Sequence, residues 1–166
     1  MTQLTHQAHS PSQSDTQIIV CCDQVKGPAN LGAIFRLADA FGVAELVLFN
    51  AELSLQSSRF KRTARHTQTR VRFRESANLI QTIDHYHQQG YSSIALEITD
   101  QSLPLDQNQQ SDLDKIVLIV GDENHGISEA VLAIASKHVH IPMRGQNSSM
   151  NVAQALGIAL YQYTQS

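Results

Sequence analysis

Cysteine is scarce in this chain, and long apolar runs are absent. Cys21 and Cys22 are its two cysteines, and adjacent cysteines cannot build a disulfide framework, so a reducing compartment is expected. No stretch approaches the roughly 18 consecutive apolar residues that a membrane-spanning helix needs. Residues 1–16 lack the charged start and the apolar segment of a secretory signal peptide. These absences predict a cytoplasmic protein with no membrane partner.

Familiar ligand-binding motifs are also missing. The first predicted strand is not followed by GxGxxG, and no GxxxxGK[ST] loop occurs, which excludes the usual dinucleotide and phosphate-loop classes. The spacing of cysteine and histidine fits no structural zinc site. His138 and His140 share one face of a predicted strand, but two histidines without a third ligand are better interpreted as solvent-facing residues. We therefore expect no metal.

The composition is that of a globular domain. Apolar residues make up 42% of the 166 positions and charged residues 16%. A chain of this length buries roughly two-thirds of its unfolded surface, and the length favours one domain. Residues 1–16 are polar and predict a disordered tail, followed by a single domain over residues 17–166.

The basic residues are concentrated in one window of a chain whose net charge is −3. Seven of the twelve lysines and arginines lie in this window, which contains no Asp or Glu: Arg59, Lys61, Arg62, Arg65, Arg70, Arg72 and Arg74. Such asymmetry indicates a binding surface for a polyanion, and the alternative is a solvated face. Residues 100–114 are acidic and long for a loop, which predicts a mobile segment.

Apolar runs alternate with helical patterns along the rest of the chain. Strands are predicted at residues 17–22, 45–49, 69–73, 92–98 and 115–120, and a further strand is predicted to end in HIPM, residues 140–143. Helices are predicted at residues 31–41, 76–88, 128–136 and 150–163. Continuous apolar strands separated by helices predict an α/β fold, with a mainly parallel sheet covered by helices on both faces. Ligands of such sheets bind beyond the carboxyl ends of the strands.

The first candidate site is DQVKGPANLGAIFR, residues 23–36, between the first strand and its helix. Asn30 is a suitable N-cap, because its side-chain oxygen can accept a hydrogen bond from a free helix N–H. Arg36 stands among apolar residues and needs an anionic partner or a path to water. The alternative is a helix with one snorkelling arginine.

Two further candidate sites follow later strands. The turn GDENHGIS, residues 121–128, carries Glu123 at its tip; the alternative is an ordinary turn before a helix capped by Ser128. Residues 140–162 contain a strand ending in IPM and a Gly/Asn/Ser loop. That loop leads into an apolar helix, and Ser149 or a neighbour is expected to cap it. The free N–H groups at the start of this helix favour anions or polar ligand atoms.

These three segments, in this order, resemble the TrmH (SpoU) family of RNA ribose 2′-O-methyltransferases in the SPOUT superfamily. The signatures stand here as NLGAIFR (30–36), IVLIVGDENHG (116–126) and IPMRGQNSSMNVAQALGIAL (141–160). The resemblance covers about residues 17–163. It implies a single α/β domain with a deep C-terminal trefoil knot, S-adenosyl-L-methionine as cofactor, a homodimer, and tRNA or rRNA as substrate.

The resemblance also implies functional residues. Position by position, the catalytic residues of the family correspond to Asn30, Arg36, Glu123, Ser149 and Asn151. Contacts to the cofactor are expected at Leu96, Gly121, Ile141, Ser149 and Met150. Contacts to RNA are expected from Arg59, Lys61, Arg62 and Arg65. The chain departs from the family at SSMN, where SLNV is more usual, at Gln154, and at FKRTARHTQ (60–68).

Two other function classes stay open. A non-catalytic RNA-binding protein of the same fold would keep the basic window but need not keep all five catalytic positions. A small-molecule enzyme with a doubly wound sheet would not explain the arginine cluster. The function we favour is a methyltransferase in which Arg36, permanently protonated, binds a phosphate and stabilises the developing alkoxide.

Overall fold

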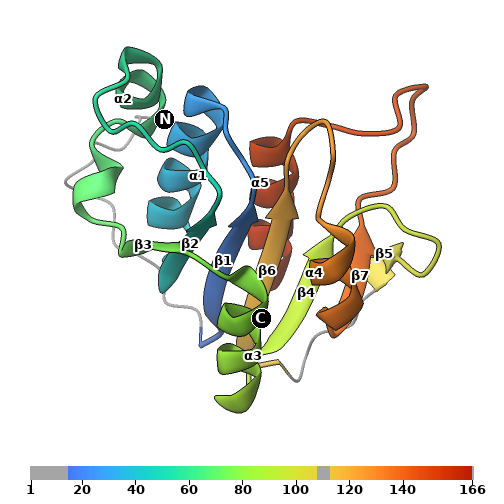
Figure 1. Cartoon of the computed structure of the whole chain (residues 1–166). Coiled ribbons are helices and arrows are strands. Elements are labelled where there is room, and N and C mark those ends of the chain that lie inside the picture. The colour runs from blue at the N-terminus through green and yellow to red at the C-terminus, as the bar shows by residue number, and fades with distance from the viewer. Residues whose placement is uncertain (1–14, 108–112, 166) are drawn as a thin grey trace, which may run out of the picture.

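The computed structural model describes residues 15–107 and 113–165 as one seven-stranded sheet with helices on both sides (Figure 1). The strand order is β3-β2-β1-β6-β4-β7-β5, and every pairing is parallel. The strands are β1 Gln17–Asp23, β2 Glu45–Phe49, β3 Phe73–Ser76, β4 Ser92–Leu96, β5 Leu103–Pro104, β6 Lys115–Gly121 and β7 Lys137–His140. The helices are α1 Pro28–Ala40, α2 Ser58–Ala64, α3 Leu79–Gln88, α4 Glu129–Ile134 and α5 Val152–Tyr163, with 3₁₀ turns η2 Thr67–Thr69 and η3 Leu105–Gln107.

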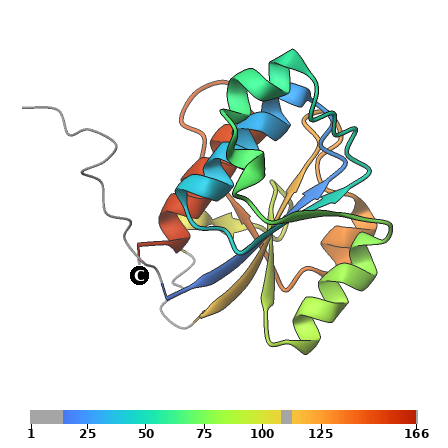
Figure 2. The same cartoon turned by 90° about the vertical axis from the view of Figure 1, so that its left-hand side faces the viewer.

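The predicted α/β class, with a parallel sheet covered on both faces, is confirmed. Alternate residues of the central strands β1 and β6 point to opposite faces, so each apolar run fills two cores. One core packs against α1, α2 and α5, and the other packs against α3 and α4 (Figures 1 and 2). Residues 1–14 of the predicted tail lie outside the described residues, and the C-terminal knot stays a prediction.

Cys21 and Cys22 are free and fully buried, one in each core. Burial raises the pKa of both thiols, that of Cys22 to about 12, so neither is a ready nucleophile. No helix in the described part of the chain combines the length and hydropathy that crossing a bilayer demands.

The first turn of α1 corrects one prediction. Gly27, not Asn30, is the N-cap, and Pro28 occupies the first helical position, where its fixed φ is favourable. Asn30 is the third helical residue, so its side chain is left available for another partner. At the other end the backbone of Gly42 has a φ of 63°, and the predicted stop of the helix at this glycine is confirmed.

The segment between β2 and β3 differs most from prediction. The strand expected at residues 69–73 is wrong: Thr69 belongs to the turn η2, and β3 begins at Phe73. Helix α2, which the sequence pattern does not predict, is anchored by Phe60, whose ring meets that of Phe35 edge-on with centroids 5.3 Å apart. It approaches α1 at Gly32, where a Cβ atom would lie 2.7 Å from the Phe60 carbonyl oxygen. This close approach fixes the basic helix α2 against the domain.

The acidic segment 100–114 is partly structured. Leu103–Pro104 forms β5, which pairs with β7, and Leu105 is buried in η3. Residues 108–112 lie outside the described residues, and the expected mobility of the segment stays a prediction.

Candidate active site at the carboxyl edge of the sheet

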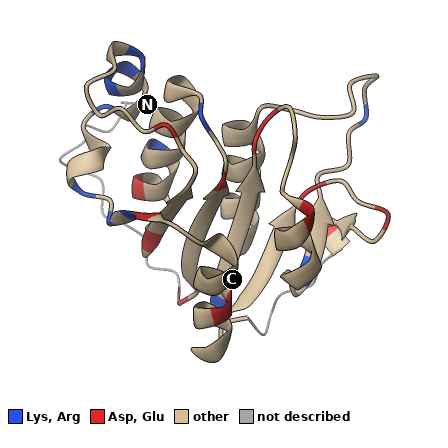
Figure 3. Cartoon of the chain, in the orientation of Figure 1, with Lys and Arg blue, Asp and Glu red and all other residues tan. Residues whose placement is uncertain are grey.

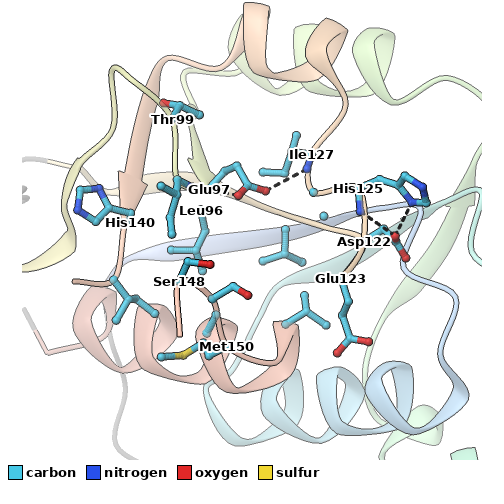
Figure 4. A pocket seen from close by; sticks show the side chains of 18 of the residues that line it. Leu96, Glu97, Thr99, Asp122, Glu123, His125, Ile127, His140, Ser148 and Met150 are labelled. Carbon is cyan, nitrogen blue, oxygen red and sulfur yellow. Dashed lines mark hydrogen bonds and ion pairs between the residues drawn. The ribbon is translucent and has the colours of Figure 1, made fainter. Parts of the chain in front are cut away.

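A cavity of about 470 Å³ opens where β4, β6 and β7 end (Figure 4). Its walls come from the loops after these three strands and from the start of α5. The expected cofactor contacts all line it: Leu96, Gly121, Ile141, Ser149 and Met150. The position is the one at which parallel sheets bind ligands, because loops from neighbouring strands converge there.

The turn after β6 folds back over its own strand, and two glycines permit this. A Cβ atom on Gly121 would overlap the backbone nitrogen of Ile127. Gly126 has a φ of +68°, and a Cβ atom there would lie 2.5 Å from Oε2 of Glu97. The same Oε2 accepts a hydrogen bond from the Ile127 N–H at 3.1 Å. The end of β4 therefore holds the end of this turn.

Asp122 fixes the tip of the turn. Its Oδ1 accepts hydrogen bonds from the backbone N–H groups of Asn124 and His125 at 3.0 and 3.1 Å, and it lies 2.9 Å from Nδ1 of His125. The His125 side chain, helped by these backbone donors, holds the pKa of the Asp122 carboxyl below its usual range. Asp122 thus shapes the loop that presents Glu123.

Asn151 connects the three sequence segments. It is the N-cap of α5, and its Oδ1 accepts from the backbone N–H groups of Ala153 and Gln154 at 3.0 and 3.3 Å. Its Nδ2 donates to Oδ1 of Asn30 at 2.9 Å and to Oε1 of Glu123 at 2.7 Å. The structure therefore brings three predicted catalytic residues into one hydrogen-bonded group.

The other two predicted catalytic residues stand apart from this group. Ser149 is exposed and lines the cavity two positions before Asn151. Arg36 is exposed on α1, and within the described residues no ion pair or hydrogen bond holds its side chain. Each residue of an α-helix is rotated by about 100° from the one before it, so six positions add up to roughly 600°, which is 120° short of two full turns. The side chain of Arg36 therefore projects about 120° away from that of Asn30. Of the two environments expected for Arg36, an anionic partner or a path to water, the structure shows the path to water.

His138 and His140 are not the solvent-facing residues that the sequence suggested. Both are half-buried: Nε2 of His138 donates to the Leu132 carbonyl at 3.0 Å, and Nδ1 of His140 lies 2.9 Å from Oγ of Ser102. The segment leading into the unpredicted strand β5 covers this side of β7. Across residues 15–107 and 113–165, no cluster of three or more His, Cys, Asp or Glu side chains is arranged to hold a metal ion.

Glu97 is a cavity residue that the sequence pattern does not single out. The predicted strand at residues 92–98 places it inside a strand, whereas β4 ends at Leu96 and leaves Glu97 in the following loop. Its Oε1 accepts a hydrogen bond from the Ile98 N–H at 3.0 Å. A charged residue immediately after an apolar run at a strand's carboxyl end is the signal that marks it.

The structure divides the basic window into two parts (Figure 3). Arg70 pairs with Asp39 at 3.7 Å, and Arg72 and Arg74 pair with the buried Glu45 at 3.0 and 3.3 Å. The four residues expected to contact RNA are exposed on or just after α2, and in the described chain none of them pairs with a carboxylate: Arg59, Lys61, Arg62 and Arg65. We name these four residues the α2 patch.

The chain is similar in sequence and in fold to known proteins. A tRNA (guanosine(18)-2′-O)-methyltransferase of Aquifex aeolicus is 32% identical over 146 residues, covering 87% of this chain and 67% of the relative. Other curated relatives are longer still, and the chain spans 60% of their length.

Two solved structures have the same fold. The S-adenosyl-L-methionine-bound rRNA methyltransferase of Sinorhizobium meliloti superimposes with a TM-score of 0.81 at 25% identity, over 91% of this chain and 56% of that one. A second structure, described as giving insights into the 2′-OH methylation of C/U34 on tRNA, superimposes with a TM-score of 0.78 at 25% identity, over 90% of this chain and 95% of that one. Residues 17–161 match the model of the SpoU rRNA Methylase family, and the chain belongs to this family.

Proposed function

We propose that the protein transfers a methyl group from S-adenosyl-L-methionine to a ribose 2′-OH of tRNA or rRNA. The observation that carries this proposal is the group Asn30–Asn151–Glu123 beside the cavity at the ends of β4, β6 and β7. The names of the Aquifex relative and of the two structural neighbours support the reaction class. Buried, reduced Cys21 and Cys22 are in keeping with a cytoplasmic setting.

The cavity fits this cofactor in size and chemistry. Its volume of about 470 Å³ falls in the range of roughly 300–1,000 Å³ that small-molecule sites occupy. Leu96, Ile141 and Met150 supply apolar surface for a nucleoside, and Ser149 and the turn at Gly121 supply polar groups. When bound, the cofactor supplies a methyl group activated on a sulfonium. The protein must then orient a hydroxyl and manage its proton.

The polar group and Arg36 divide this work. Asn151 holds the Glu123 carboxylate at a fixed place, where it orients the ribose hydroxyl. A guanidinium stays protonated in proteins, so Arg36 is not the base. Arg36 does not line the cavity of its own chain, and we propose that it acts on RNA held over the cavity. There it binds the phosphate next to the target ribose and stabilises the developing alkoxide, while water or that phosphate accepts the proton.

The α2 patch is the surface proposed to bind the RNA backbone. Its four cations face solvent, whereas the arginines at 70, 72 and 74 are already paired with carboxylates. Phosphate contacts release counterions and supply most of the sequence-independent affinity for nucleic acid. A patch fixed on a helix that packs tightly at Gly32 orients the RNA relative to the cavity.

A second copy of the chain is the proposed partner. On α5, Ile158 and Tyr161 are 44% and 59% exposed, although both are apolar in character. They neighbour Gly157, above which Leu37 of α1 packs. Covering this face in a homodimer would remove the exposed apolar surface from water. Light scattering of the parent protein and of Ile158→Glu tests it: a dimer that dissociates on substitution supports the proposal, and a monomeric parent contradicts it.

Methyl transfer to bulk RNA tests the function. Protein is incubated with methyl-labelled cofactor and RNA, with and without prior RNase digestion. We expect label in acid-insoluble RNA that RNase removes. Binding of RNA without transfer of label would favour the non-catalytic RNA-binding alternative, and label that is insensitive to RNase would favour a different acceptor.

A further inference from the structure

The charge of the cavity wall is one-sided. Glu97, Asp122 and Glu123 all line the cavity, and among the described residues no lysine or arginine does. Asp122 is engaged within its own turn, with His125, and Glu123 with Asn151. Glu97 is the carboxylate whose hydrogen bonds come from backbone N–H groups alone.

Glu97 is held rigidly in the cavity. Each of its two oxygens accepts one hydrogen bond from a backbone N–H group, at Ile98 and at Ile127, and Gly126 leaves room for the carboxylate. Figure 4 shows the side chain beside Leu96 with its carboxylate directed toward the Ile127 amide. Because neither bond partner is a cation, these contacts leave the negative charge of Glu97 uncompensated. The same holds for Glu123, whose partner Asn151 is a neutral amide, but Glu123 is exposed whereas Glu97 is half-buried.

We propose that Glu97 determines the preference of this cavity for the cationic cofactor over the neutral product that remains after methyl transfer. The inference rests on the proposed function. S-adenosyl-L-methionine carries a sulfonium, an ammonium and a carboxylate, a net charge of +1. When the methyl group leaves, the electron pair of the broken C–S bond stays on sulfur, and S-adenosyl-L-homocysteine is a thioether of net charge zero.

The cavity is small enough for this charge difference to change the affinity for the ligand. A ligand within about 470 Å³ lies within roughly 10 Å of the walls, about one Debye length at 0.1 M salt. At such distances, and at a dielectric constant between those of protein and water, one fixed charge changes the affinity of a +1 ligand by about 3- to 30-fold relative to a neutral ligand.

Calorimetric titration of the protein with both ligands tests the proposal. The quantity measured is the ratio of the Kd for S-adenosyl-L-homocysteine to the Kd for S-adenosyl-L-methionine. Because both ligands fill the same cavity, a change of shape weakens both and cancels in this ratio, whereas a change of charge does not. Glu97→Gln removes the charge and Glu97→Asp keeps it. Glu129→Gln removes an exposed carboxylate of α4 that does not line the cavity.

We expect Glu97→Gln to lower the ratio about 3- to 30-fold, with less effect at high salt. Glu97→Asp and Glu129→Gln should keep the parent ratio, even where Glu97→Asp weakens both ligands. A ratio unchanged in Glu97→Gln, or lowered equally in Glu129→Gln, overturns the proposal. Failure of the parent protein to bind either ligand is a distinct result, which overturns the proposed function as well.

Discussion

Nδ2 of Asn151 lies 2.9 Å from Oδ1 of Asn30, which joins the start of α5 to the first turn of α1 across 121 positions of sequence. The same Nδ2 reaches Glu123 in the turn after β6. One side-chain amide therefore assembles residues from three loops, and its own oxygen caps a helix at the same time.

Replacing Asn151 by aspartate separates these two tasks. Aspartate caps a helix as well as asparagine, so the cap of α5 is kept, and thermal stability should fall only by the loss of the bonds to Asn30 and Glu123 and by the repulsion between two carboxylates. The substitution replaces the N–H donor by an acceptor that faces Glu123, and we expect methyl transfer to fall at least about 100-fold. Single-turnover assays beside thermal melts measure both effects. Asn147→Asp, in the exposed loop of residues 141–150, is the matched control and should keep the parent rate.

Arg36 should matter for turnover far more than for cofactor affinity. Loss of one preorganised donor costs about 100- to 1,000-fold in rate. We expect this loss in Arg36→Ala, and little recovery in Arg36→Lys, because lysine lacks the planar fork. Both variants should bind the cofactor as the parent does. If both methylate RNA at nearly the parent rate, Arg36 acts only as an exposed surface residue.

The α2 patch should set the salt dependence of RNA binding. Arg62→Gln with Arg65→Gln should flatten the plot of log affinity against log salt by about 0.7 to 0.9 for each phosphate that the protein no longer neutralises. Arg70→Gln with Arg72→Gln removes the same charge from arginines already paired with Asp39 and Glu45, so the slope should change less. If the slope changes equally in the two double variants, the α2 patch does not bind phosphates in preference to the rest of the basic window, and the whole window is an ordinary solvated surface.

Tyr86 should stabilise the fold through Glu45. Its hydroxyl donates to this buried carboxylate, so Tyr86→Phe should lower the free energy of unfolding by about 1–3 kcal/mol. Burial, followed by the hydrogen bond to Glu45, raises the pKa of Tyr86 from 10.0 to about 12. The contribution is therefore complete below pH 10 and is lost as pH rises toward 12.

Urea unfolding at several pH values measures this difference. Tyr91→Phe, which removes an exposed hydroxyl bonded to Gln17, should cost much less. Equal stability losses in the two variants would contradict the role given to Glu45.

Burial explains which elements the sequence revealed. β1 and β6 are buried on both faces and form continuous apolar runs, and the predicted bounds of β2, 45–49, are those observed. α2 has only Phe60 and Ala64 buried in seven residues, which leaves no helical period to detect. β3 pairs on one side only and has no fully buried residue, so its position could not be predicted from hydrophobicity.

The sequence predicted which three segments form the site, but it could not predict which of their side chains contact one another. The strand order that sets β6 between β1 and β4 brings Asn30 and Glu123 to Asn151, and this order is a property of the whole sheet. The burial of His140 could not be predicted because its partner Ser102 precedes a two-residue strand, too short to leave a pattern. Pro28 was the available signal that α1 begins before Asn30.

The position of the transferred methyl group shows whether the protein methylates ribose. RNA from a strain lacking the gene is labelled by the purified protein and methyl-labelled cofactor, then hydrolysed with alkali. A methylated 2′-oxygen cannot attack the adjacent phosphodiester, so ribose methylation leaves the label in alkali-stable dinucleotides. We predict label in dinucleotides for the parent protein and its near absence for Asn151→Asp. Label in mononucleotides would mean that the acceptor is not a ribose 2′-oxygen, and equal labelling by both proteins would mean that the Asn30–Asn151–Glu123 group takes no part in the transfer.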